Sequence, residues 1–219
     1  MELLVSRLPY YLEMLGIGTA ATVVIAIGAF VFAVILGLAL TIVRQSRGSV
    51  APVFVTGYVE VFRNTPTLAQ LLIIYFSLVQ MGIFVPSLVA GIVGLGFGGA
   101  AALSEVFRAS LLAIDKGQSE AAQSLGMRRV ARLRYIIVPQ GARIALPSVS
   151  NYAIGLLKDT SLASAVAVPE LALRARILVA DTYDSTTIYL LVALIYLTMS
   201  VSLSLLFSSL ERRAKWGLT

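Results

Sequence analysis

Long stretches without a charged side chain dominate this sequence. Thirty consecutive residues (14–43) and then 41 more (64–104) contain no Asp, Glu, Lys or Arg, and a third run of 26 residues covers 185–210. About 20 apolar residues are enough for one helix to cross the hydrocarbon core of a bilayer. The sequence therefore predicts an all-α, polytopic integral membrane protein.

The apolar runs divide into five transmembrane helices. The second run is long enough for two crossings, and Met81, Gly82 and Pro86 supply a hairpin near its middle. The stretch 144–172 carries only three charged residues, Lys158, Asp159 and Glu170. The expected spans are residues 17–43, 58–79, 87–114, 144–172 and 185–210. A chain of 219 residues has room for one compact unit, so we expect a single transmembrane domain over residues 1–219.

Basic residues between the spans predict an orientation through the positive-inside rule. The first connector carries Arg44 and Arg47, the segment 115–143 carries six basic and two acidic residues, and the tail is basic. The other connectors are neutral or acidic. Five crossings then place the amino terminus outside and the carboxyl terminus in the cytoplasm of a bacterial cytoplasmic (inner) membrane. The first apolar run is too long for a cleaved signal peptide.

The composition excludes most enzyme chemistries. Hydrophobic residues make up 58% of the chain and charged residues 13%, and mean hydropathy is +0.91. The chain has no histidine and no cysteine, so the commonest general base, the commonest metal ligand and thiolate chemistry are absent. We therefore predict no catalytic and no metal site. The net charge is +6, and the basic residues lie between the apolar spans. They therefore indicate the topology of the chain in the membrane and not nucleic-acid binding.

One polar, basic segment interrupts the apolar pattern: EAAQSLGMRRVARLRYIIVPQGAR, residues 120–143. Its start predicts a short amphipathic helix with Ala121, Ala122 and Leu125 on one face. Gly126 suits a left-handed residue that closes this helix, and Pro139 predicts a change of direction. A helix this short is marginal alone and needs a packing partner.

The order E-A-A, three residues, G, nine residues, I-x-V-P in this segment resembles the cytoplasmic coupling loop of ABC importer permeases, with Val138 in place of the usual leucine. The resemblance implies a type I ABC importer permease fold and a coupling loop at about 115–140 that contacts a separate ATPase. The contact residues it implies are Glu120, Ala121, Ala122, Gly126 and Pro139. No G-x-x-x-x-G-K-[ST] phosphate loop occurs, so ATP and Mg would be bound by the partner and not by this chain.

Two further strings resemble the branch of this family that takes up polar amino acids of the histidine, glutamine, arginine or glutamate type. They are F-R-N-T-P at 62–66 with Gln70, and NYAIGLLKDTSL at 151–162. The resemblance implies a permease subunit that works with an ATPase dimer, a second permease (identical or paralogous) and an extracytoplasmic amino-acid-binding protein. Three alternatives stay open: import of another small solute, half of a secondary transporter, which would show inverted repeats, and an intramembrane enzyme.

Polar side chains inside the spans are the candidates for a substrate path, because charges at membrane depth usually face the bundle or a wet cavity. They are Gln70, Glu105, Asn151, Lys158, Asp159, Thr160 and Ser161. Glu105 can instead pair with Arg108 on one helix face, and Lys158 with Asp159 can cap a broken helix. Gly155 and the Thr160–Ser161 pair predict a break in the fourth span.

Overall fold

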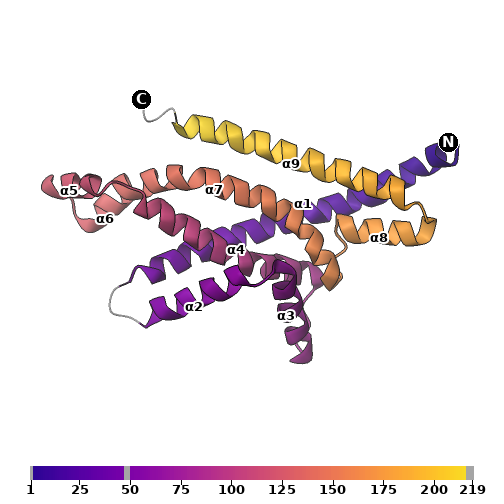
Figure 1. The fold of residues 1–219 in the computed structure, drawn as a ribbon, viewed down its shortest axis with the longest axis horizontal. Coiled ribbons are helices and arrows are strands. Elements are labelled where there is room, and N and C mark those ends of the chain that lie inside the picture. The colour runs from indigo at the N-terminus through magenta and orange to yellow at the C-terminus, as the bar shows by residue number, and fades with distance from the viewer. Residues whose placement is uncertain (1, 47–49, 216–219) are drawn as a thin grey trace.

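The computed structural model describes residues 2–46 and 50–215, which form helices and connecting turns without a strand. The four longest helices, α1 (Glu2–Arg44), α4 (Ser87–Leu112), α7 (Val138–Asp159) and α9 (Ser185–Lys215), lie roughly along the long axis of the molecule, with α7 antiparallel to the other three (Figure 1). The shorter elements are α2 (Ala51–Asn64), α3 (Thr67–Gln80), α5 (Lys116–Ser124), α6 (Arg129–Arg132), the π-helical turn η1 (Leu133–Ile137), the 3-10 segment η2 (Thr160–Val166) and α8 (Leu171–Thr182).

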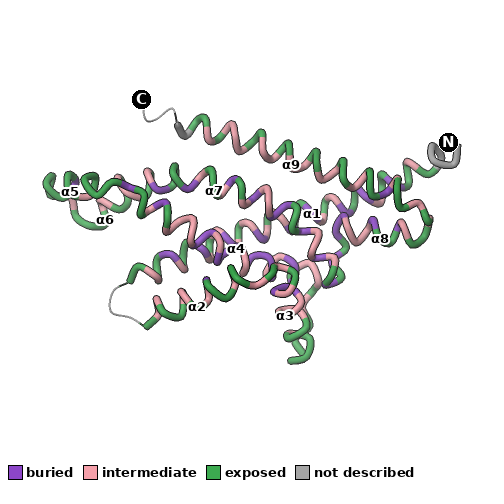
Figure 2. The backbone as a smooth tube through the Cα atoms, viewed as in Figure 1, coloured by how far each residue is buried: buried purple, intermediate pink, exposed green. Residues whose placement is uncertain are grey.

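Small residues allow α1 and α4 to approach each other closely. A Cβ atom on Gly37 of α1 would lie 3.2 Å from the carbonyl oxygen of Ala100, and one on Gly99 of α4 would lie 2.8 Å from the Cβ atom of Ala33. Helices in lipid associate largely through such backbone contact, because lipid tails are as apolar as the side chains. Buried positions gather where α1, α4 and α7 meet, whereas α9 is mostly exposed (Figure 2).

Three predicted spans are confirmed as single helices, because α1, α4 and α9 are each long and apolar enough to cross a membrane. The prediction of one helix over 58–79 is wrong, since the chain breaks between α2 and α3. Thr65 is extended (φ −108°, ψ 133°), as the residue before a proline prefers, and Pro66 has no N–H for a continuous helix. The helix α3 then leaves the direction of α2 at a steep angle (Figure 1). The count of five spans stays a prediction, with α2–α3 and α7 as the remaining crossings.

The predicted span 144–172 is also not one helix. The helix α7 begins at Val138 and ends at Asp159, and the chain continues as η2. This confirms the break predicted at Thr160–Ser161. The Oγ1 atom of Thr160 donates to the carbonyl oxygen of Leu157 at 2.7 Å and so satisfies one backbone acceptor at the end of α7.

The two ends of the molecule carry different connectors. The helices α5 and α6 and the last turn of α1 lie at one end, and α8 and the start of α1 lie at the other (Figure 1). The basic segment is therefore separated along the long axis from the segment 170–184, which has two basic and three acidic residues. This separation agrees with the connector pattern from which the orientation is predicted.

The carboxylate of Glu170 joins three helices. Sequence analysis assigns no role to this residue. Glu170 is fully buried, and its oxygens accept hydrogen bonds from the backbone N–H groups of Ala172 and Leu173, both at 2.8 Å, at the start of α8. The same carboxylate accepts from the hydroxyl of Tyr196 on α9 at 3.0 Å and from that of Thr22 on α1 at 3.5 Å. It caps α8 and ties it to both neighbours.

We expect Glu170→Ala to lower the midpoint of thermal unfolding in detergent. The substitution leaves two N–H groups and two hydroxyls without their acceptor, and each buried unsatisfied group costs about 1–3 kcal/mol. Glu13→Ala, at an exposed position of α1, is the matched control and should leave the midpoint unchanged. Equal midpoints for the two variants would contradict the structural role of Glu170.

Candidate functional site

The segment that resembles a coupling loop forms a capped helix. A side-chain oxygen of Asp115 accepts from the backbone N–H of Gly117 at 2.6 Å and begins α5. At the other end Gly126 has φ +74°, with hydrogen bonds from its own N–H to the carbonyl of Gln123 (2.9 Å) and from Met127 N–H to the carbonyl of Ala122 (3.1 Å). This pair of bonds is a Schellman motif, which favours glycine at its left-handed position. The prediction that Gly126 closes the helix is confirmed.

Most of the α5 surface is free within the chain. Ala122 is buried, with α5 packing against η1 and α6, whereas Ala121 and Leu125 on the same predicted face are exposed. Leu125 is 82% exposed and Val130, in α6 of the same loop, is 76% exposed. Within this chain, only Ala122 of the predicted face finds a packing partner, and Ala121 and Leu125 remain exposed. An exposed leucine and valine next to the arginines of α6 make a surface suited to contact with another chain.

Pro139 has a different effect from the one that the sequence predicts. The chain does not leave the helical path there, because it passes from α6 through the π-helical turn η1 directly into α7. The N–H of Val138 reaches back five residues to the carbonyl of Leu133, and Pro139 then occupies the first turn of α7, where a missing N–H is tolerated.

A cavity of about 250 Å³ lies beside the break between α2 and α3. The end of α2, the start of α3, the middle of α4 and the end of α7 contribute its walls. The lining residues that carry polar groups are Arg63, Thr65, Thr67, Gln70, Tyr152 and Asp159. Two glycines of α4, Gly98 and Gly99, form part of the wall and leave room for these side chains.

Gln70 holds the break in place. Its amide nitrogen donates to the carbonyl oxygens of Phe62 at 2.6 Å and Thr65 at 2.7 Å, which belong to the end of α2. A helix end leaves such carbonyls without intrahelical partners, and within a bilayer no water is present to replace them. Gln70 Oε1 is buried against Gly98 without a hydrogen-bond partner among the described residues. Gln70 thus lines the cavity while its donor atoms are engaged within the protein.

The other predicted path residues fall into two groups. Asp159 lines the cavity, and Thr160 and Ser161 follow it with hydroxyls that donate to backbone carbonyls of α7. Asn151 and Lys158 are exposed on α7 and line none of the cavities found among the described residues.

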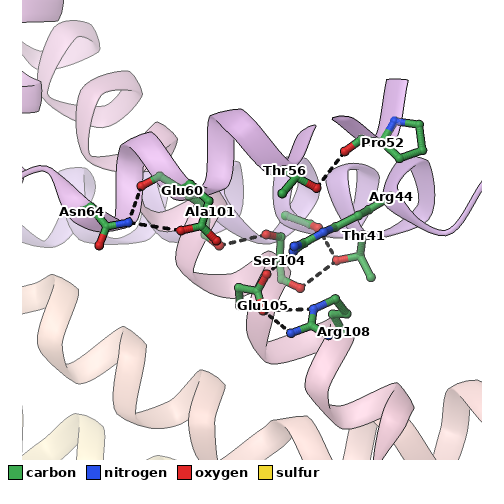
Figure 3. Close-up of polar contacts among 11 residues, drawn as sticks. Thr41, Arg44, Pro52, Thr56, Glu60, Asn64, Ala101, Ser104, Glu105 and Arg108 are labelled. Carbon is green, nitrogen blue, oxygen red and sulfur yellow. Dashed lines mark hydrogen bonds and ion pairs between the residues drawn. The ribbon is translucent and has the colours of Figure 1, made fainter. Parts of the chain in front are cut away.

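Glu105 lies in a second cavity of about 600 Å³, which α2, α4 and α7 enclose toward the α5 end of the molecule. Its carboxylate pairs with Arg44 from the last turn of α1 and with Arg108 one turn further along α4, the latter at 2.6 Å (Figure 3). The hydroxyl of Thr41 donates to the carbonyl oxygen of Ser104 at 3.2 Å beside this cluster. The predicted Glu105–Arg108 pair is confirmed, and Arg44 is an additional partner that joins α1 to α4.

Among the described residues, no three Asp or Glu side chains come together in a way that could hold a metal ion. The arrangement instead offers a polar cavity in a helical bundle and, at one end, a capped helix with an exposed surface. Sequence analysis does not identify Arg63 as a cavity residue, although it stands in the F-R-N-T-P string that was singled out.

Comparisons with known proteins identify the family of this chain. Residues 29–216 match the family described as "Binding-protein-dependent transport system inner membrane component". The probable amino-acid permease protein YxeN of Bacillus subtilis is 37% identical over 216 residues, which cover 96% of this chain and 94% of YxeN. The probable glutamine ABC transporter permease protein GlnP of the same organism is 35% identical, covering 93% of this chain and 94% of GlnP.

Solved structures show the same fold. A chain from the crystal structure of an amino acid ABC transporter with histidines superposes with a TM-score of 0.89 at 34% identity, covering 94% of this chain and 97% of that one. A chain of the inward-facing MetNI methionine ABC transporter gives a TM-score of 0.76 at 20% identity, covering 93% of this chain and 97% of that one. The chain therefore belongs to the family of binding-protein-dependent transport system inner membrane components and is the permease subunit of an ABC importer, not an enzyme.

Proposed function

We propose that this permease moves polar amino acids across the bacterial cytoplasmic membrane. The observation that carries the proposal is the cavity at the α2–α3 break, because Arg63 and Asp159, one basic and one acidic residue, both line it. A zwitterionic amino acid needs both kinds of group at membrane depth, because unpaired charge there costs several kcal/mol. The identity of 34–37% to amino-acid permeases and an amino acid ABC transporter supports this substrate class.

The partners follow from the same proposal. An ATPase dimer binds ATP and Mg and contacts the exposed surface of α5, where Glu120, Ala121 and Gly126 lie. A second permease, identical or paralogous, completes the membrane unit, and an extracytoplasmic binding protein delivers the amino acid. Movement of the ATPases displaces α5, and the three residues 113–115 connect α5 to α4, which forms a wall of both cavities.

Reconstitution of the complete complex tests the proposal. The permease, its ATPase and its binding protein are placed in liposomes with ATP inside, and uptake is measured for each labelled amino acid and for sugars and peptides as controls. We expect uptake of one or a few polar amino acids together with stimulated ATP hydrolysis. Uptake of another solute class without any amino acid would contradict the proposed substrate.

Gly126→Arg should assemble with the ATPase and yet abolish uptake. A side chain at φ +74° is strained, and the arginine adds bulk and charge to the exposed surface beside Leu125. Gly126→Ala is the matched control: it bears the same backbone strain, and its Cβ atom meets open space within the chain. We expect it to keep most of the uptake. Normal uptake by Gly126→Arg with the ATPase bound would contradict the coupling role.

Asp159→Asn should lower uptake while stimulation of ATP hydrolysis by the loaded binding protein is retained. The substitution keeps the size of the side chain and removes the negative charge from the cavity that we assign to the ammonium group. Assembly is checked by co-purification with the ATPase. Unchanged uptake would show that the ammonium group finds its partner elsewhere.

The proposed orientation is testable because the chain has no cysteine. An impermeant maleimide added to intact cells should label Tyr183→Cys, whose position is 91% exposed beyond α8. Val130→Cys, at an exposed position within the coupling loop, should be labelled only after the membrane is permeabilised. Labelling of position 130 in intact cells would reverse the proposed topology.

A further inference from the structure

Arg63 is shared by the two polar cavities of the bundle. It lines the cavity of about 250 Å³ at the α2–α3 break, here called the inner cavity, together with Gln70 and Asp159. It also lines the cavity of about 600 Å³ nearer the α5 end, here called the outer cavity, together with Glu105. Ala102 is the other residue common to both. We propose that Arg63 is a specificity residue that holds the carboxylate of the amino acid while the substrate passes from the inner cavity to the outer one. This inference rests on the proposed transport of amino acids.

Arg63 is an exposed residue of α2 that borders both polar cavities. It lies in the last turn of α2, twelve residues beyond Ala51, which places it about 18 Å along the helix from the end near α5. Charged residues within the helical bundle of a membrane protein usually pair with an opposite charge or face a water-filled cavity. Within the part of the chain that the structure describes, the Arg63 guanidinium has no hydrogen bond or ion pair.

The nearby acids do not neutralise it. Glu105 shares the outer cavity with Arg63, but its two carboxylate oxygens are already engaged by Arg44 and Arg108. Asp159 comes from α7 and lines the inner cavity without an ion pair to Arg63. The donors of Arg63 are thus free for an anionic group that enters the cavity.

A carboxylate is the group that fits these donors. The planar guanidinium presents two parallel N–H groups that match the two oxygens of a carboxylate, and charge-assisted bonds of this kind are about twice as strong as neutral ones. Ala102, with its small side chain, is the other residue at the junction of the cavities. A carboxylate held by Arg63 can therefore keep this contact as the rest of the molecule moves from one cavity to the other.

Direct binding to the purified permease–ATPase complex, without the binding protein, tests the role of Arg63. The probe is the labelled amino acid that the uptake screen selects, and the competitor is its α-amide, which keeps the ammonium group and lacks the carboxylate. The unmodified complex should bind the amino acid about tenfold or more tightly than the amide. Arg63→Gln should bind both compounds equally, and Arg63→Lys should retain part of the preference because it keeps the charge but not the planar pair of donors.

Arg176→Gln is the matched control, since it removes one arginine from an exposed position of α8 at the opposite end of the molecule. It should keep the full preference for the carboxylate. A preserved preference in Arg63→Gln overturns the inference even when uptake by the unmodified complex is normal. An unmodified complex that imports no amino acid overturns the proposed function instead, so the two failures are distinguishable. Loss of ATPase binding by both Arg63 variants would assign Arg63 a structural role and also overturn the inference.

Discussion

The polar interior of this bundle depends on two helix breaks, at which side chains form hydrogen bonds to the backbone groups that the helices leave free. A helix that stops inside a bilayer exposes carbonyl and N–H groups that water cannot reach. At the first break, Gln70 donates to two carbonyls at the end of α2. At the second, Thr160 donates to Leu157. Thr65 and Asp159, one from each break, line the same cavity, so the two interruptions together create one polar space at the centre of an apolar protein.

The Arg44–Glu105–Arg108 cluster gives this space a mechanical connection to the coupling loop. It ties the last turn of α1 to α4, and the Thr41 hydroxyl adds a bond to the α4 backbone nearby. Only three residues, 113–115, separate the end of α4 from the start of α5. Under the proposed coupling role, a displacement of α5 would reach α4 and α1 together. The helix α4 contributes Gly98 and Gly99 to the inner cavity and Glu105 to the outer one.

Sequence analysis predicts the features that depend on local patterns and misses those that depend on distant contacts. Uncharged runs locate α1, α4 and α9. The tolerance of glycine for a left-handed backbone conformation locates the cap at Gly126. An uncharged run cannot distinguish a straight helix from a broken one, although Pro66 is a local signal for the break between α2 and α3. Nothing local identifies Glu170 as a junction, because its partner Thr22 is 148 residues away.

The charged residues that contact the two cavities or the helix junctions differ in how many hydrogen-bond and ion-pair partners they have within the protein. Glu105 has two arginine partners and Glu170 has four hydrogen-bond donors. Arg63 and Asp159 have no hydrogen bond to a described residue, yet they share one cavity. Both side chains are exposed at the cavity, so their charges are accessible to a ligand that enters it. A ligand that carries both charges, as an amino acid does, would supply a partner to each of them while it occupies the cavity.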